Sequence, residues 1–151
     1  MMSQHKVVYI DMDDVLCDYS AAFNQALKAT PEVAYPQSQY GFYANLLPID
    51  GAIESVNKLI SAEEYEPYIL TAPSTMNPLC YTEKRVWIEK YFGIEFTEKL
   101  IISPNKALLK GELLIDDNAS GRGQEHFDGE FIQFGTEAFP TWSAVCQYLG
   151  L

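Results

Sequence analysis

Short apolar runs recur along the chain and are separated by segments with helical spacing. Residues Val7–Ile10 form a β-branched and aromatic run that is typical of a buried strand. Runs of similar character follow at wide intervals, and we predict further strands over residues 67–71, 99–103, 112–116 and 130–135. Between them, apolar positions three and four residues apart predict helices over residues 20–29, 50–63, 81–93 and 141–149.

Capping and turn residues mark the ends of some of these elements. Asp50 precedes an apolar stripe and is predicted as the N-cap of its helix. Gly93 follows the last apolar positions of another helix, where glycine usually ends a helix. Residues 31–48 hold prolines and aromatic residues without a regular period, so we predict an irregular insertion there.

Strands that alternate with helices indicate the fold class. This order is typical of a parallel sheet whose two faces are both covered. We therefore predict an α/β fold built on a single doubly wound parallel sheet, a three-layer sandwich in one domain over residues 1–151. We also predict a small cap insertion after the first strand and helix, at approximately residues 19–48.

The charge balance narrows the classes of partner. The chain has 151 residues, with 10 Lys and Arg against 21 Asp and Glu, and its formal net charge is −11. Long nucleic acid binds to basic surfaces, so we predict no such partner. If the substrate is anionic, a local positive charge must offset this excess, and a divalent cation is the obvious candidate.

Membrane and disulfide chemistry are also unsupported by the sequence. No apolar run approaches the roughly 18 residues of a membrane helix, and the start "MMSQHK" lacks the apolar core of a signal peptide. Three cysteines, Cys17, Cys80 and Cys146, are widely spaced and include no CxxC pair. We predict a reducing cytoplasm and no membrane partner.

Polar residues fall where several predicted strands end. Asp11 and Asp13 follow the first strand, Thr71 ends the second, Lys106 comes shortly after the third, and Asp116 and Asp117 end the fourth. Ligands of open parallel sheets bind outside the carboxyl ends of the strands. Each residue alone has an ordinary explanation as a turn, cap or solvated group. Together they would supply oxygen ligands for a hard cation and donors for an anion.

Phosphoryl transfer through a covalent aspartate requires this combination. A carboxylate that attacks phosphorus approaches an anion, so the repulsion between them must first be neutralised, and magnesium can do this. Lys106 and Thr71 would contact the phosphoryl oxygens. Asp13, two residues beyond Asp11, would protonate the leaving group and later deprotonate water.

Four motifs carry a resemblance to a known superfamily. "DMDDVLCDYS", "ILTAP", Lys106 and "LLIDDN", in this order, resemble the haloacid dehalogenase (HAD) superfamily of phosphotransferases. More narrowly, "TAPSTMNPLCYTEKRVWIEKYFG", "PNK" and "ELLIDD" resemble the 5′(3′)-deoxyribonucleotidases, and the similarity covers most of the chain. The resemblance implies a HAD-like, Rossmann-type fold.

The resemblance also implies roles for individual residues. Asp11 would be the nucleophile and Asp13 the acid and base. Mg²⁺ would be bound by Asp11, the backbone carbonyl of Asp13, and Asp117, with Asp116 in support. The phosphate would be held by Thr71, the backbone at Ala72, Lys84 and Lys106.

Three aromatic residues fall where the family lines its base pocket. Tyr19, Phe42 and Tyr43 could bury a nucleobase by stacking, or they could form the small core of the insertion, and the sequence leaves both open. The chain departs from the family in three ways: Asp14 replaces a usual glycine and predicts an altered or strained turn, Ala72 replaces a serine, and the cap is shorter.

The predicted function is that of a magnesium-dependent phosphomonoesterase, a 5′(3′)-deoxyribonucleotidase acting on deoxynucleoside monophosphates. One alternative is a HAD-type phosphatase for another small phosphomonoester. A receiver-like signalling domain fits less well, because receivers carry their phosphorylated aspartate after a middle strand, whereas Asp11 follows the first. A silent binding module is disfavoured because all four catalytic positions hold competent residues. A homodimer is left open.

Overall fold

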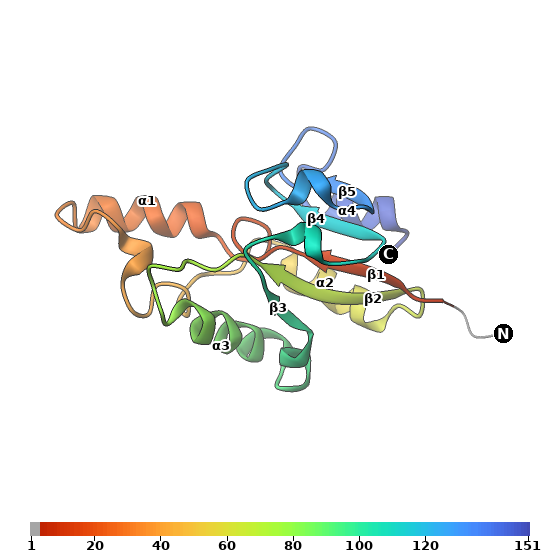
Figure 1. Cartoon of the computed structure of the whole chain (residues 1–151), viewed down its shortest axis with the longest axis horizontal. Coiled ribbons are helices and arrows are strands. Elements are labelled where there is room, and N and C mark those ends of the chain that lie inside the picture. Colours follow the sequence, from red (N-terminus) through yellow and green to blue (C-terminus); the bar gives the residue numbers. More distant parts are fainter. Residues whose placement is uncertain (1–3) are drawn as a thin grey trace.

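A five-stranded parallel sheet organises residues 4–151, the part of the chain that the computed structural model describes (Figure 1). The strands run in the order β3-β2-β1-β4-β5, and every neighbouring pair is parallel. The five predicted strands are confirmed, with bounds β1 Lys6–Ile10, β2 Tyr65–Thr71, β3 Leu100–Ile102, β4 Leu113–Asp116 and β5 Glu130–Gln133.

The strand order places a reversal of direction beside β1. The chain moves outward from β1 through β2 to β3, and then returns across the sheet to β4 and β5. Connections on the two sides of such a point lead away from each other, so they leave a crevice at the carboxyl ends of the strands. Asp11 follows β1 and Asp116 ends β4, so both lie at this crevice.

One face of the sheet is covered by helices. Side chains alternate between the two faces along a strand, and Val8 and Ile10 of β1 point to the face on which the main hydrophobic core lies. That core contains buried residues from the three helices α2 Ala52–Ser61, α3 Cys80–Phe92 and α4 Trp142–Leu149. These are three of the four predicted helices.

The other face is covered by short turns rather than by α-helices. Tyr9, Leu70 and Leu114 form a second cluster there with Phe127. The connections on this side contain the 3₁₀ turns η3 Lys106–Leu108 and η4 Gln124–His126. The predicted α/β sheet with two covered faces is confirmed, and its second layer is thin. Because this layer is thin, Lys106 of η3 lies directly above the carboxyl ends of the strands.

The remaining predicted helix, α1 Tyr19–Ala29, projects away from the sheet (Figure 1). It begins the segment predicted as a cap over residues 19–48, which also contains the 3₁₀ turn η1 Pro36–Ser38. The chain enters and leaves this segment through a narrow neck. There, Asp18 N donates to Leu47 O over 2.8 Å and Ile49 N donates to Leu16 O over 2.8 Å.

Glu83 of α3 fastens the cap segment to the core. Its buried carboxylate accepts hydrogen bonds from Gly41 N at 3.0 Å and Ala44 N at 3.1 Å. A buried carboxylate is costly unless its oxygens are paired, and here both oxygens are paired with cap backbone. The next residue, Lys84, points into the predicted site region, so one turn of α3 serves both the cap and the site.

Two further core side chains bind cap backbone. Trp87 Nε1 donates to Leu46 O over 2.8 Å, and Asn77 Nδ2 donates to Gln37 O over 3.0 Å. Trp87 and Asn77 are both completely buried. The return path of the cap segment is therefore fixed to the core at several points.

Smaller predictions can be compared directly. Gly93 ends α3 as predicted, but Asp50 as the N-cap of α2 is wrong: Gly51 occupies that position in a left-handed conformation, so the helix begins later. Trp87 and Trp142 are buried, and all three cysteines are buried and free of disulfides. Among the described residues, no helix is long and apolar enough to span a bilayer.

We predict that Glu83→Gln lowers the free energy of unfolding by about 1–3 kcal/mol, because one cap N–H would then face an amide donor and lose its partner. Urea denaturation measures the change. Glu89→Gln on the same helix is the control, since Glu89 forms only an exposed pair with Arg85 and such pairs contribute about 0–1 kcal/mol. Equal effects of the two substitutions would contradict the anchoring role of Glu83.

Candidate active site

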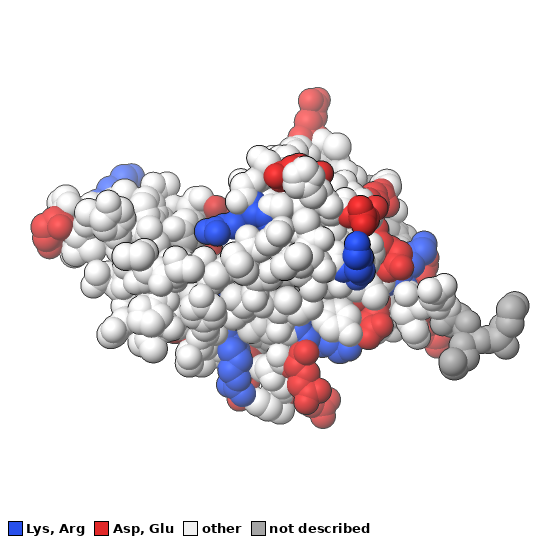
Figure 2. All heavy atoms as spheres, viewed as in Figure 1, with Lys and Arg blue, Asp and Glu red and all other residues white. Residues whose placement is uncertain are grey.

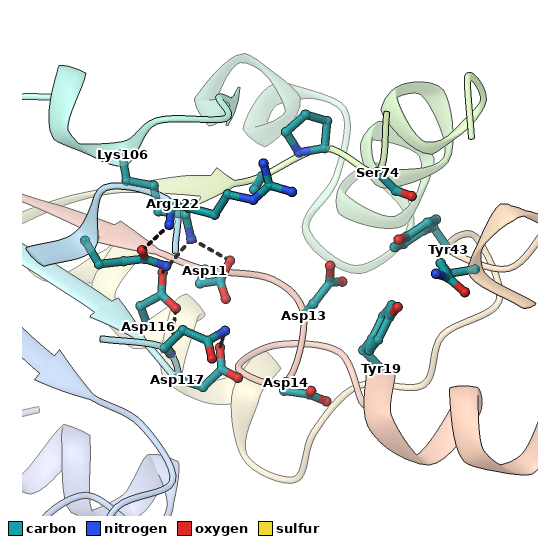
Figure 3. Close-up of a pocket in the computed structure, with 15 residues that line it drawn as sticks. Asp11, Asp13, Asp14, Tyr19, Tyr43, Ser74, Lys106, Asp116, Asp117 and Arg122 are labelled. Carbon is teal, nitrogen blue, oxygen red and sulfur yellow. Dashed lines mark hydrogen bonds and ion pairs between the residues drawn. The ribbon is translucent and has the colours of Figure 1, made fainter. Parts of the chain in front are cut away.

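A polar pocket of about 320 Å³ lies at the carboxyl ends of β1 and β4 (Figure 3). Its wall contains most of the predicted site residues: Asp11, Asp13, Ala72, Lys106, Asp116 and Asp117. These side chains come from separate strand ends and from η3. The strand ends therefore converge on one edge of the sheet, as the sequence predicts.

Lys106 is the central cation of the pocket. Its Nζ donates to Asp11 Oδ1 over 2.8 Å and also to Asp116 Oδ2, and all three side chains are buried. Burial by itself lowers the pKa of Lys106, but the charges of the two carboxylates outweigh it and the pKa is raised. The ammonium group therefore stays charged and joins β1 to β4 electrostatically.

Asp116 is completely buried and fully hydrogen-bonded. Asn118 N donates to Oδ1 over 3.0 Å, and Gln124 Nε2 reaches Oδ2 over 3.3 Å, beside the Lys106 bond. This carboxylate therefore organises the loop that follows β4. Its neighbour Asp117 is more open and lines the pocket.

Asp11, Asp116 and Asp117 could hold a metal ion together, because one carboxylate oxygen from each lies within 4.8 Å of the others. Burial raises the pKa of Asp11 well above its ordinary value, against the charge of Lys106. Burial also raises the pKa of Asp117 to about 6, and the charge of Asp116 adds to the rise. One ammonium cannot balance three carboxylates. An oxygen-only set with surplus negative charge fits a hard divalent cation.

Asp13 stands apart from this triad, between it and the side chains of Tyr19 and Tyr43 (Figure 3). Lys84 Nζ donates to Asp13 Oδ2 over 3.2 Å and to Thr71 Oγ1 over 2.5 Å. Lys84 and Thr71 are completely or almost completely buried and lie behind the pocket wall, where Lys84 holds Asp13. Asp13 Oδ1 is buried without a hydrogen-bond partner among the described residues.

Asp14 has the altered turn that the sequence predicts. Its φ is +62°, a left-handed conformation that L-residues other than Asn and Asp rarely adopt. Its carboxylate accepts hydrogen bonds from Ser20 N over 2.8 Å and from Ser20 Oγ over 2.6 Å. Asp14 therefore connects the turn after β1 to the start of α1, which a glycine could not do.

The three aromatic residues of the cap form one cluster. The Tyr19 and Phe42 ring centroids are 5.5 Å apart, and those of Phe42 and Tyr43 are 5.3 Å apart. Tyr19 and Tyr43 line the pocket, whereas Phe42 is not among its lining residues. Tyr43 is only 4% exposed. Tyr43 belongs to the main hydrophobic core, and Tyr19 and Phe42 pack against it, so the cluster is core that also forms a wall of the pocket.

Sequence reasoning missed Arg122, which extends across the pocket from the Lys106 side (Figure 3). It lies between Gly121 and Gly123, both at positive φ, and its carbonyl accepts a 2.6 Å hydrogen bond from Lys106 N. A Cβ at position 123 would lie 2.1 Å from Asn105 Oδ1, so glycine is required there. An arginine between two glycines, soon after the Asp116–Asp117 pair, was the available signal.

Comparison with known proteins identifies the family. The sequence profile of the family described as "5′ nucleotidase, deoxy (pyrimidine), cytosolic type C protein" matches residues 28–138. A Vibrio phage KVP40 protein assigned to the 5′(3′)-deoxyribonucleotidases is 37% identical over 95% of this chain and 84% of its own length. The chain belongs to the 5′(3′)-deoxyribonucleotidase family. The human cytosolic enzyme of this family is 30% identical over 82% of this chain and 76% of its own length.

Solved structures confirm the HAD-like fold of this deoxyribonucleotidase family member. YfnB of Bacillus subtilis, described as a HAD hydrolase and crystallised with magnesium, superposes with a TM-score of 0.66 at 14% identity. The match covers 98% of this chain and 100% of that chain. The family is one of phosphoric monoester hydrolases, and its assignment removes the receiver-domain alternative.

The surface of this family member matches its acidic composition. On the face drawn in Figure 2, Lys and Arg side chains lie singly among Asp and Glu, and they do not gather into one basic area. Inside the pocket, buried Lys106 and the side chain of Arg122 lie among several aspartates. A face without a basic area offers no docking surface for an extended polyanion.

The Asp14 turn generates a paired prediction. Asp14→Ala should be less stable than Asp14→Gly by about 1 kcal/mol, because both lose the Ser20 hydrogen bonds but only glycine tolerates positive φ freely. Chemical denaturation of the two variants measures the difference. If Asp14→Ala is as stable as Asp14→Gly, the left-handed conformation is not the constraint at this position.

Proposed function

We propose that this protein is a magnesium-dependent 5′(3′)-deoxyribonucleotidase, which releases phosphate from deoxynucleoside monophosphates through an aspartyl-phosphate. The observation that supports it most is that buried Asp11, Lys106 and Asp116 share one pocket wall with the more open Asp117, in a chain of this family. Hydrolysis of a phosphomonoester follows from the family, whereas the metal, the covalent step and the sugar and base are our proposals.

The donor set fits a divalent cation. Asp11, Asp117 and the backbone carbonyl of Asp13 would bind Mg²⁺, and Asp116 would support it through Lys106 and Asn118. When bound, the metal ion would supply positive charge that offsets the repulsion between carboxylate and phosphate. The surplus negative charge of the three acids is consistent with that need.

The phosphate would be held mainly by cations. Lys106 and the backbone at Ala72 lie on the pocket wall, and Arg122 crosses it. Lys84 donates to both Asp13 and Thr71, and its third N–H and the Thr71 hydroxyl would turn to a phosphoryl oxygen while the Asp13 contact is kept. Donors fixed before substrate arrives stabilise the charge that develops in the transition state.

The chemistry would proceed in two displacements. An Asp11 oxygen attacks phosphorus, and the bond from phosphorus to the ester oxygen breaks. Asp13 gives its proton to the departing alkoxide of the deoxynucleoside. Asp13, now a carboxylate, takes a proton from a water molecule, which attacks the phosphorus and breaks the Asp11–phosphorus linkage. Phosphate leaves, Asp11 is restored as a carboxylate, and Asp13 is protonated again.

The unpartnered Oδ1 of Asp13 supports this role, because this oxygen has no other partner among the described residues and is free to carry the transferred proton. Lys84 keeps the carboxyl group in place through the other oxygen. The cytoplasmic location, the homodimer and the boundaries of the cap stay predictions from the sequence.

Asp11→Asn tests the nucleophile. The amide has nearly the same shape but is a poor nucleophile and a weaker ligand, so turnover of deoxynucleoside monophosphates should fall on the order of 10³-fold or more. Phosphate release is the assay, and a chelator should abolish wild-type activity that added Mg²⁺ restores. Substantial turnover by a well-folded Asp11→Asn protein would remove Asp11 from its role.

Asp13→Asn tests the acid. The loss of activity should be larger for a deoxynucleoside monophosphate, whose alkoxide needs a proton, than for p-nitrophenyl phosphate, whose leaving group does not; general acid catalysis is worth about 10²–10⁴-fold. Rates on the two substrates give the comparison. Equal losses on both would count against proton donation by Asp13.

A further inference from the structure

One buried acceptor in the cap has no partner among the described residues. Gln37 Oε1 is inaccessible to solvent and receives no hydrogen bond. Buried polar atoms are nearly always paired in native proteins, so each exception needs an explanation. Gln37 lines the polar pocket together with Asp13, Tyr43 and Arg122, and a ligand in that pocket could supply the missing donor.

Gln37 also lines a second cavity, of about 500 Å³, which adjoins the polar pocket. The two share four wall residues: Gln37, Pro73, Ser74 and Arg122. The second cavity is more apolar, and its wall includes Tyr35 and Met76, which are 68% and 82% exposed. A ligand that extends beyond a phosphate in the polar pocket would therefore meet an amide and exposed apolar side chains.

The core holds Gln37 in position. Its backbone carbonyl accepts the 3.0 Å hydrogen bond from Asn77 Nδ2, and Asn77 is completely buried. The preceding Pro36, at the start of η1, is also buried. The backbone from which the Gln37 side chain extends is therefore fixed, which lowers the entropy lost when a ligand binds.

We propose that the Gln37 carboxamide binds the polar edge of the nucleobase, with the base in the second cavity against Tyr35 and Met76. An acceptor oxygen cannot bind a phosphate oxygen, so its ligand must bring an N–H or O–H donor. A nucleobase combines such donors with a flat apolar face, as this cavity requires. The inference rests on the proposed function and concerns recognition of the nucleobase, which the phosphate site does not contact.

Gln37→Met tests the inference, because methionine keeps the length of the side chain and removes both hydrogen-bonding groups. The kcat/KM for deoxyuridine monophosphate should fall on the order of 10-fold, mostly through KM, the equivalent of one lost hydrogen bond. The kcat/KM for 2-deoxyribose 5-phosphate, which has the sugar and phosphate but no base, should not change. Gln39→Met is the matched control, since Gln39 is exposed and lines neither cavity.

Inhibition by deoxyuridine gives a second measurement that does not depend on turnover of the base-bearing substrate. With 2-deoxyribose 5-phosphate as substrate, Gln37→Met should raise the inhibition constant of deoxyuridine on the order of 10-fold. Gln39→Met should leave this constant unchanged. The melting temperature of each variant separates this loss from a general loss of folding.

Three results would overturn the inference. One is an unchanged kcat/KM of Gln37→Met on the nucleotide, and another is an equal fall on the nucleotide and on 2-deoxyribose 5-phosphate, which would place Gln37 with the sugar, the phosphate or the fold. The third is a wild-type enzyme that hydrolyses both substrates equally well, which would remove the base site and leave the phosphatase. A wild-type enzyme that hydrolyses neither would instead refute the proposed function.

Discussion

A single buried ammonium group balances the centre of this molecule. Lys106 lies between Asp11 after β1 and Asp116 at the end of β4, and all three are buried. Charges removed from water are tolerated only when they are paired, so the loop that carries Lys106 must lie directly over the strand ends. The thin second layer of the sheet makes that approach possible. Because Lys106 pairs with Asp11 and Asp116 while Asp117 adds a third carboxylate beside them, the pocket keeps a deficit of positive charge that a ligand ion can fill.

Much of the site was predictable because the carboxyl ends of parallel strands lie at the same edge of the sheet. Asp11, Thr71 and Asp116 end three neighbouring strands, so their order in the sequence was enough to place them together. The strands themselves were predictable from apolar runs, because a strand buried on both faces has little polar content. Lys106 was harder, but its distance from the third strand is short enough that the loop has little freedom.

The residues that sequence reasoning missed lie on loops whose positions depend on distant contacts. Arg122 reaches the pocket because its backbone binds that of Lys106, and Gln37 does so because Asn77 holds it; neither contact leaves a pattern in the sequence. The wrong prediction of Asp50 as an N-cap has a local cause. Gly51 adopts a left-handed conformation and is itself the N-cap of α2. Lys84, predicted to hold the phosphate, is buried beside Asp13, and a sequence motif does not give the depth at which a side chain lies; its phosphate contact stays a prediction.

The attachment of the cap has a consequence for how this enzyme could be diversified. The segment is held at its start by the Asp14–Ser20 pair, at its return by Glu83, and at its neck by backbone hydrogen bonds. Between these fixed points, residues 30–35 form a connection outside the α-helices and strands. Insertions and deletions there would change the length of the cap segment without moving the catalytic residues. Substrate selectivity could therefore change through this connection while the catalytic site stays the same.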